Sequence, residues 1–187
     1  MIATMLFSVK INVNAENSDL PMAGFTSFVN EINTFNVPKK EKHLIINHNG
    51  MKTFMSYTTI TNKTSNQYKL QQMAYTDEEG FRKVNNRYCV AIGTAFGAYV
   101  GQIFDAELEN GTIIECIVGD IKADKDTDKS NVFTSQGCCL EFIVDMKQLN
   151  GTIKTMGNCS MLCDEWDSSC YQFIIYDIDY FKKGESE

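Results

Sequence analysis

Residues 102–118 read QIFDAELENGTIIECIV, and this stretch carries the clearest structural signal in the chain. Polar and apolar residues alternate over positions 102–108, as expected for a half-buried β-strand. Glu109-Asn110-Gly111 follows as a turn, and residues 112–118 suit the returning strand. The stretch therefore predicts a β-hairpin in the middle of the fold.

Further short strands are predicted on both sides of this hairpin. Residues 88–92 are apolar and end at a glycine, and residues 51–61 are rich in β-branched and aromatic side chains. Two more apolar runs follow at residues 140–145 and 172–178. Several short strands with glycine turns between them predict an all-β fold with minor α content.

The first fifty residues have a different character. Residues 2–9 are apolar and Val13-Asn14-Ala15 resembles a cleavage site, so residues 1–15 are either the remnant of a signal peptide or a buried strand. Apolar residues recur at three- and four-residue steps over positions 25–35, which predicts one amphipathic helix. We therefore expect an N-terminal extension with one helix at residues 16–50 and a β domain at residues 51–187.

Charge and hydropathy argue against a nucleic-acid partner and against a membrane-spanning helix. The net charge is −7 and no basic face is evident, which argues against nucleic acid. No run of about 18 apolar residues is present, so no membrane-spanning helix is expected. We expect the protein to be monomeric.

All seven cysteines lie at or after residue 89. In an exported protein they predict one to three disulfides and a leftover thiol, whereas in a cytosolic protein they would stay reduced. No Cys-x-x-Cys pair occurs, and His43 and His48 are distant in sequence. A zinc site is therefore disfavoured, and no metal or cofactor is expected.

Three short motifs connect the second half to a known family. Val90-Ala91-Ile92-Gly93, Val118-Gly119-Asp120 and Leu140-Glu141-Phe142-Ile143 follow one another in the order and setting of that family's strand motifs, and Phe54-Met55-Ser56-Tyr57 is similar to its opening strand. Residues 88–145 thus resemble the double-psi β-barrel family. Its members include rare lipoprotein A-like proteins, the barrel of membrane-bound lytic transglycosylase A and the three-aspartate domains of cell-wall proteins. The resemblance implies a six-stranded double-psi β-barrel that acts on peptidoglycan or another cell-wall glycan. It also implies a secreted or cell-wall protein of bacterial or prophage origin.

The chain departs from the family pattern at three places. Gly93 replaces the first acid, Ile121-Lys122 replaces Thr-Gly, and Glu141 replaces the third aspartate. Glu141 keeps the charge on an arm that is one methylene longer. The three-aspartate signature is therefore incomplete.

The resemblance implies a lytic transglycosylase-like reaction, in which one carboxyl group acts first as acid and then as base. Glu141 is the predicted acid/base and Asp120 the assisting acid, provided that both lie at one end of the barrel. We expect the substrate to contact Tyr57, Lys122, Asp124 and Asp128.

Other interpretations remain open. The missing acid at Gly93 favours a non-catalytic binding or structural module of a cell surface or phage tail, and an unrelated cytosolic β fold is a third hypothesis. Asp124 to Asp128 alternates acids like a calcium loop, but Lys129 and Ser135 stand where glycine and glutamate are required, which favours a solvated acidic loop. Trp166 is either a sugar-stacking platform or a core plug, and we favour the plug.

Overall fold

The described part of the protein is residues 39–46 and 49–182 of a computed structural model. These residues belong to one unit of tertiary contacts that spans residues 38–187. The predicted signal remnant or strand at residues 1–15 and the predicted helix at residues 25–35 lie outside the described residues.

Strands dominate the described residues, with two α-helices and five short 3-10 turns between them. The predicted all-β class with minor α content is confirmed. The strands are β1 (Lys40–Leu44), β2 (Thr53–Ser56), β3 (Tyr75–Thr76), β4 (Arg82–Val84), β5 (Arg87–Ile92), β6 (Gln102–Leu108), β7 (Ile113–Ile121), β8 (Glu141–Val144) and β9 (Cys170–Asp179), and the helices are α2 (Asn66–Met73) and α3 (Gly151–Met156).

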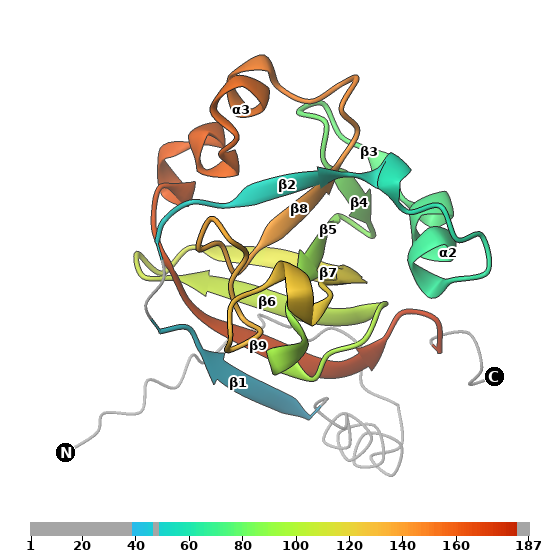
Figure 1. The fold of residues 1–187 in the computed structure, drawn as a ribbon, viewed down its shortest axis with the longest axis horizontal. Coiled ribbons are helices and arrows are strands. Elements are labelled where there is room, and N and C mark those ends of the chain that lie inside the picture. The colour runs from blue at the N-terminus through green and yellow to red at the C-terminus, as the bar shows by residue number, and fades with distance from the viewer. Residues whose placement is uncertain (1–38, 47–48, 183–187) are drawn as a thin grey trace, which may run out of the picture. The chain divides into compact units, whose positions relative to one another are not determined.

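All nine strands belong to one mixed sheet (Figure 1). The main path runs β1-β9-β6-β7-β5-β4-β3, and β8 branches from β5 to pair with β2. The β5–β7 and β2–β8 ladders are parallel, and the other ladders are antiparallel. The predicted hairpin is confirmed as β6 and β7, with Ile103 opposite Ile117.

The burial of each strand follows from its neighbours. β6 alternates between buried and half-buried residues, as its alternating sequence predicts. β8 is buried along its whole length, and it pairs with β2 at one edge and with β5 at the other. Glu141, at the start of β8, is therefore a carboxylate at the margin of the core.

Aromatic side chains fill the centre of the fold. Phe142 on β8 stacks on Trp166 with ring centroids 5.0 Å apart and an interplanar angle of 13°. Phe81 and Tyr88 meet both rings edge-on, at 5.1–5.9 Å. Trp166 is only 7% exposed, so its predicted role as a core plug is confirmed.

The sheet is not closed by strand pairing. In the described residues no ladder joins β2 to β1 or to β9. Figure 1 shows β2 and β8 running together on one side of the unit, with β6 and β9 on the other. The finer prediction of a closed six-stranded barrel is therefore not confirmed by the pairing pattern.

Helix α2 resolves an alternative that the sequence leaves open, since residues 68–74 fit either a strand or a short helix. Ser65 caps the helix, and its Oγ accepts a hydrogen bond of 3.1 Å from the amide of Tyr68. At the other end the Arg82 guanidinium donates to the carbonyl oxygens of Gln71 and Ala74, at 2.6 and 2.8 Å. These two contacts hold the helix against β4.

Among residues 39–46 and 49–182, no helix has the length and apolar character needed to cross a membrane.

Candidate functional site

A polar pocket of about 530 Å³ lies where β7 and β8 meet the loop between them. Charged, hydroxyl and amide side chains line it, and none of the lining residues is aromatic. We call it the loop pocket, and its lining residues are Lys122, Lys125, Asp126, Thr127, Asp128, Thr134, Ser135, Gln136 and Glu141.

Glu141 is held at the base of the loop pocket by the backbone. It pairs with Thr53 on β2 and with Ala91 on β5, so its position is fixed from both sides. Its Oε2 atom forms an ion pair with Nζ of Lys122, and the two side chains are 11% and 19% exposed. An ion pair with so little solvent contact is costly to break, because either partner alone would leave a poorly solvated charge.

Asp120 and Glu141 lie on opposite sides of one residue of β5, Ala91. Ala91 pairs with Asp120 of β7 in one direction and with Glu141 of β8 in the other. Two strand spacings separate the backbones of the two acids, which corresponds to about 10 Å. The structure therefore brings the two predicted catalytic residues to one level of the sheet.

The surroundings of Asp120 differ from those of Glu141. The Asp120 carboxylate accepts hydrogen bonds from the amide of Ile121 at 2.9 Å and from Nε2 of Gln67 at 3.4 Å. Burial raises the pKa of Asp120, although these two hydrogen bonds and the charge of Lys122 act in the opposite direction. A carboxyl group of this kind can hold a proton at higher pH than a solvated aspartate.

The two acids line separate pockets. Asp120 and Gln67 form part of a second pocket, of about 270 Å³, whose other walls are residues 59–62 with Met55 and Ser65. Lys122 links the two pockets, since it pairs with Glu141 and its charge also acts on Asp120. Asp120, Lys122 and Glu141 are therefore one group of charges, and their catalytic role stays a prediction.

The acidic loop is ordered by its own hydrogen bonds. The Asp128 carboxylate accepts from Oγ of Ser130, at 2.6 and 2.8 Å, and from the amides of Val132 and Phe133, both at 3.1 Å. These bonds, with that of Ser130 foremost, lower the pKa of Asp128 to about 2. Within the described residues no three His, Cys, Asp or Glu side chains are placed to hold a metal ion together.

Asp124 and Tyr57 are the remaining residues predicted to bind substrate. Asp124 accepts a hydrogen bond of 2.6 Å from Oγ1 of Thr94 and so ties the loop to the end of β5. The Tyr57 ring lies under the Arg82 guanidinium, 4.7 Å from the ring centroid, and lines a third pocket of about 300 Å³. Tyr57 therefore does not share the loop pocket with Glu141, and its predicted contact with substrate is untested.

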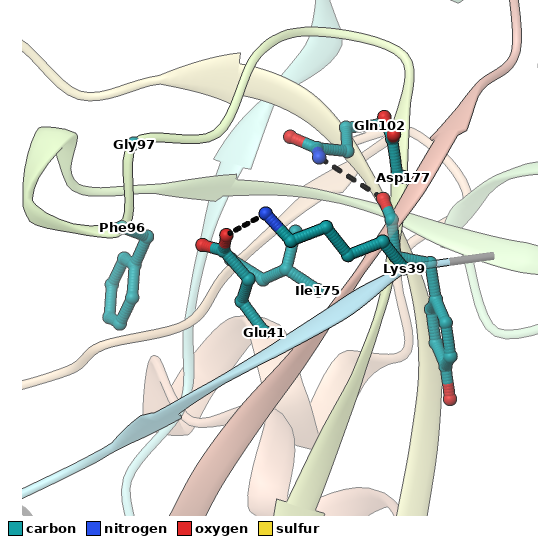
Figure 2. A pocket seen from close by; sticks show the side chains of 8 residues that line it. Lys39, Glu41, Phe96, Gly97, Gln102, Ile175 and Asp177 are labelled. Atoms are coloured by element: carbon teal, nitrogen blue, oxygen red, sulfur yellow. Dashed lines mark hydrogen bonds and ion pairs between the residues drawn. The ribbon is translucent and has the colours of Figure 1, made fainter.

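A further pocket, of about 250 Å³, lies between β1 and β9 (Figure 2). Here Nζ of Lys39 meets the carboxylate of Glu41 at 3.2 Å, and the Gln102 amide donates to the carbonyl oxygen of Tyr176 at 3.1 Å. Both partners of the ion pair are largely exposed. We interpret it as a surface groove whose polar groups satisfy one another.

Sequence reasoning missed two residues that shape the fold around the site. Lys52 is a lysine with no exposed surface, although nothing in the stretch Met51-Lys52-Thr53 marks it as buried. Gly93 was interpreted only as a lost acid, whereas a Cβ atom there would lie 1.9 Å from the carbonyl oxygen of Asn131. The close approach of the acidic loop thus requires glycine, and an acid at this position would not fit.

A scan against protein-family models gives no match for this chain, and a search of curated proteins finds no relative.

Proposed function

We propose that this chain is a secreted protein active on cell-wall glycan, with a lytic transglycosylase-like reaction centred on Asp120, Lys122 and Glu141. The observation that carries the proposal is that Asp120 and Glu141 flank the same residue, Ala91, from the two strands that pair with β5. Lys122 lies within electrostatic reach of both acids. A glycan that crossed Lys122 would meet one carboxyl group on each side.

We infer that six of the strands are those of a double-psi β-barrel. The strands β2-β8-β5-β7-β6-β9 form one continuous run of pairings that contains both parallel ladders. Lys52, directly before β2, supports closure of this run: its carbonyl oxygen accepts from the amide of Cys159, and its ammonium donates to the carbonyl oxygen of Ser168, two residues before β9. The first and last strands of the run are β2 and β9. We infer that the Lys52–Ser168 contact, next to the start of each, takes the place of a ladder between them.

The properties of the two acids suggest a division of labour. A transglycosylase requires a proton donor for the leaving oxygen and negative charge near the oxocarbenium-like transition state. The raised pKa of Asp120 suits the donor, which exchanges the roles that the resemblance implies. The Glu141 carboxylate, oriented by Lys122, would then stabilise the positive charge of the sugar.

The test is incubation of the full chain with purified peptidoglycan, followed by analysis for anhydro-muropeptides. We expect release by the wild type and a loss of roughly 100-fold or more in both Asp120→Asn and Glu141→Gln. Glu78→Gln, which changes an exposed glutamate, is the control and should match the wild type. Absence of release by the wild type, or full activity of Glu141→Gln, would contradict the proposal.

A second candidate is a non-catalytic binding or structural module of a cell surface or phage tail. Two observations favour it: the Glu141 carboxylate is occupied by Lys122, and the two acids line different pockets. Sedimentation with insoluble peptidoglycan separates the candidates, because this version binds the wall and releases no fragments.

A further inference from the structure

Two of the seven cysteines are direct neighbours in space. Cys139 lies two residues before Glu141, which pairs with Thr53 next to Lys52, and Cys170 lies two residues after Ser168, whose carbonyl oxygen is 2.8 Å from Nζ of Lys52. Both are free thiols, and each affects the pKa of the other. They are 6% and 2% exposed, respectively. Two segments that are distant in sequence therefore meet around Lys52, and each brings a buried thiol.

The other five cysteines have partners of a different kind. The Cys116 thiol donates to the carbonyl oxygen of Ile114 at 3.3 Å, and the Cys159 thiol donates to that of Thr53 at 3.6 Å. The remaining thiols each contact a nitrogen- or oxygen-bearing group: Cys89 with Gln71, Cys138 with Thr134, and Cys163 with Glu165. A thiol as the main interaction partner distinguishes Cys139 and Cys170.

A buried ammonium group lies beside this pair. Nζ of Lys52 donates to the carbonyl oxygens of Trp166 and Ser168, both at 2.8 Å, and its charge acts on Cys139 and Cys170. A cation and a thiol donor next to one sulfur favour its thiolate, which is the nucleophile in thiol–disulfide exchange. The environment thus favours one of the two sulfurs as the attacking thiolate.

We propose that Cys139 and Cys170 form an intramolecular disulfide when the protein meets a disulfide donor. The Cys170 thiolate attacks one sulfur of the donor, the donor's S–S bond breaks, and one donor thiolate leaves. Cys139 then loses its proton, attacks the Cys170 sulfur of the mixed disulfide, and expels the second donor thiolate. Two protein thiols are oxidised and one donor disulfide is reduced to two thiols.

The titration of the pair agrees with this order of events. The hydrogen bond from Cys139 and the charge of Lys52 lower the pKa of Cys170, against the effect of burial. The same hydrogen bond, together with burial, raises the pKa of Cys139 well above its ordinary value. Cys170 is therefore the attacking thiolate and Cys139 the resolving thiol.

The bond would link the starts of β8 and β9, which do not pair with each other. Thr53 pairs with Glu141, so Lys52 and Cys139 precede that pair by one and two residues, respectively. Oxidation would consequently anchor the end of β8 that carries Glu141. Because both sulfurs are nearly covered, we expect slow formation and, once formed, resistance to reduction.

The experiment treats the full chain with oxidised glutathione at pH 8, blocks the remaining thiols with N-ethylmaleimide and digests with chymotrypsin without reduction. Cleavage after Trp166 separates Cys163 from Cys170, and cleavage after Met161 with cyanogen bromide separates Cys159. The expected product joins the peptide TSQGCCLEF (134–142) to DSSCY (167–171). The same link should form in Cys138→Ser and be absent in Cys139→Ser.

Oxidation should also raise the midpoint of thermal unfolding by roughly 5–15 °C in the wild type, and this gain should disappear in Cys170→Ser. Fragment spectra of the wild-type peptide assign the bond to Cys138 or Cys139 without any variant, so poor folding of a variant does not obscure the result. A bond that involves Cys138, Cys159 or Cys163 in place of the proposed pair, or seven blocked thiols after treatment, would overturn the proposal.

Discussion

The buried ammonium of Lys52 donates a hydrogen bond to the carbonyl oxygen of Trp166, 2.8 Å away. The carbonyl oxygens of Ser168 and Gly50 and Oγ of Ser160 lie 2.8–3.2 Å from the same nitrogen, so its three N–H groups are shared among four acceptors. One side chain thus satisfies groups from three segments that have no ladder in common. This makes Lys52 the polar connection between the entry to β2 and the entry to β9.

Replacing Lys52 by Met should cost about 2–5 kcal/mol of unfolding free energy, because several buried oxygen atoms would lose their donor. Urea denaturation followed by the fluorescence of Trp166, the single tryptophan, measures the change. Lys69→Met on the exposed side of α2 is the matched control and should change the free energy by less than about 0.5 kcal/mol. Equal stability of the two variants would contradict the role given to Lys52.

Gly93→Ala should destabilise the protein by about 3 kcal/mol, since the new methyl group would collide with backbone atoms of Asn131. Gly151→Ala is the control, because an added Cβ there meets no atom within 4 Å. Thermal unfolding of both variants provides the comparison. A Gly93→Ala protein as stable as the wild type would show that the acidic loop does not press on this residue.

Asp128 should contribute to acid sensitivity. Its pKa is about 2 in the folded protein against 3.8 as the reference value, so the folded state binds fewer protons than the unfolded state between these values. The stabilisation is present above pH 4 and is lost as the pH falls towards 2. Urea titrations between pH 2 and 5 should therefore show a shallower pH dependence in Asp128→Asn than in the wild type.

Asp126→Asn is the control for this measurement, because it removes a charge from the same loop without removing the hydrogen bonds to Ser130, Val132 and Phe133. It should retain the slope of the wild type. Identical slopes in Asp128→Asn and the wild type would refute the assignment.

The Lys122–Glu141 ion pair should show strong coupling. Lys122→Met alone leaves the Glu141 carboxylate without its partner and should cost about 3 kcal/mol. The double variant Lys122→Met/Glu141→Leu should recover much of that loss, because no uncompensated charge remains. A double-mutant cycle measured by urea denaturation quantifies the coupling, and additive effects would show that the pair is energetically unimportant.

Local patterns in the sequence were sufficient to predict individual strands. The alternation over residues 102–108 predicts β6 with the bounds that the structure has, and the apolar run at 88–92 predicts nearly all of β5. The short strands β3 and β4 and the helix α3 were not predicted, because two or three residues carry no periodicity and residues 151–156 have only one buried apolar side chain. The apolar run Leu44-Ile45-Ile46 would suit a short strand, but β1 lies earlier, at Lys40–Leu44.

Pairing between distant strands could not be predicted from local patterns. β1 falls in the segment assigned to the N-terminal extension, yet it pairs with β9 along its whole length. The resemblance pointed to Asp120 and Glu141 as acids and to Lys122 as a substrate contact, but the ion pair between Lys122 and Glu141 was not predicted. Strand pairings and ion pairs between distant residues depend on how the whole chain folds, so a local sequence pattern does not reveal them.

The position of β9 between β1 and β6 has a consequence for how the protein is made. β9 is the last of the described strands in chain order, yet it is an interior member of the sheet, so β1 has no partner among these strands until β9 has been synthesised. Contacts between such distant segments form slowly, and the waiting edges are open to association with other chains. Expression at lower temperature, or with chaperones in excess, should therefore improve the yield of folded protein.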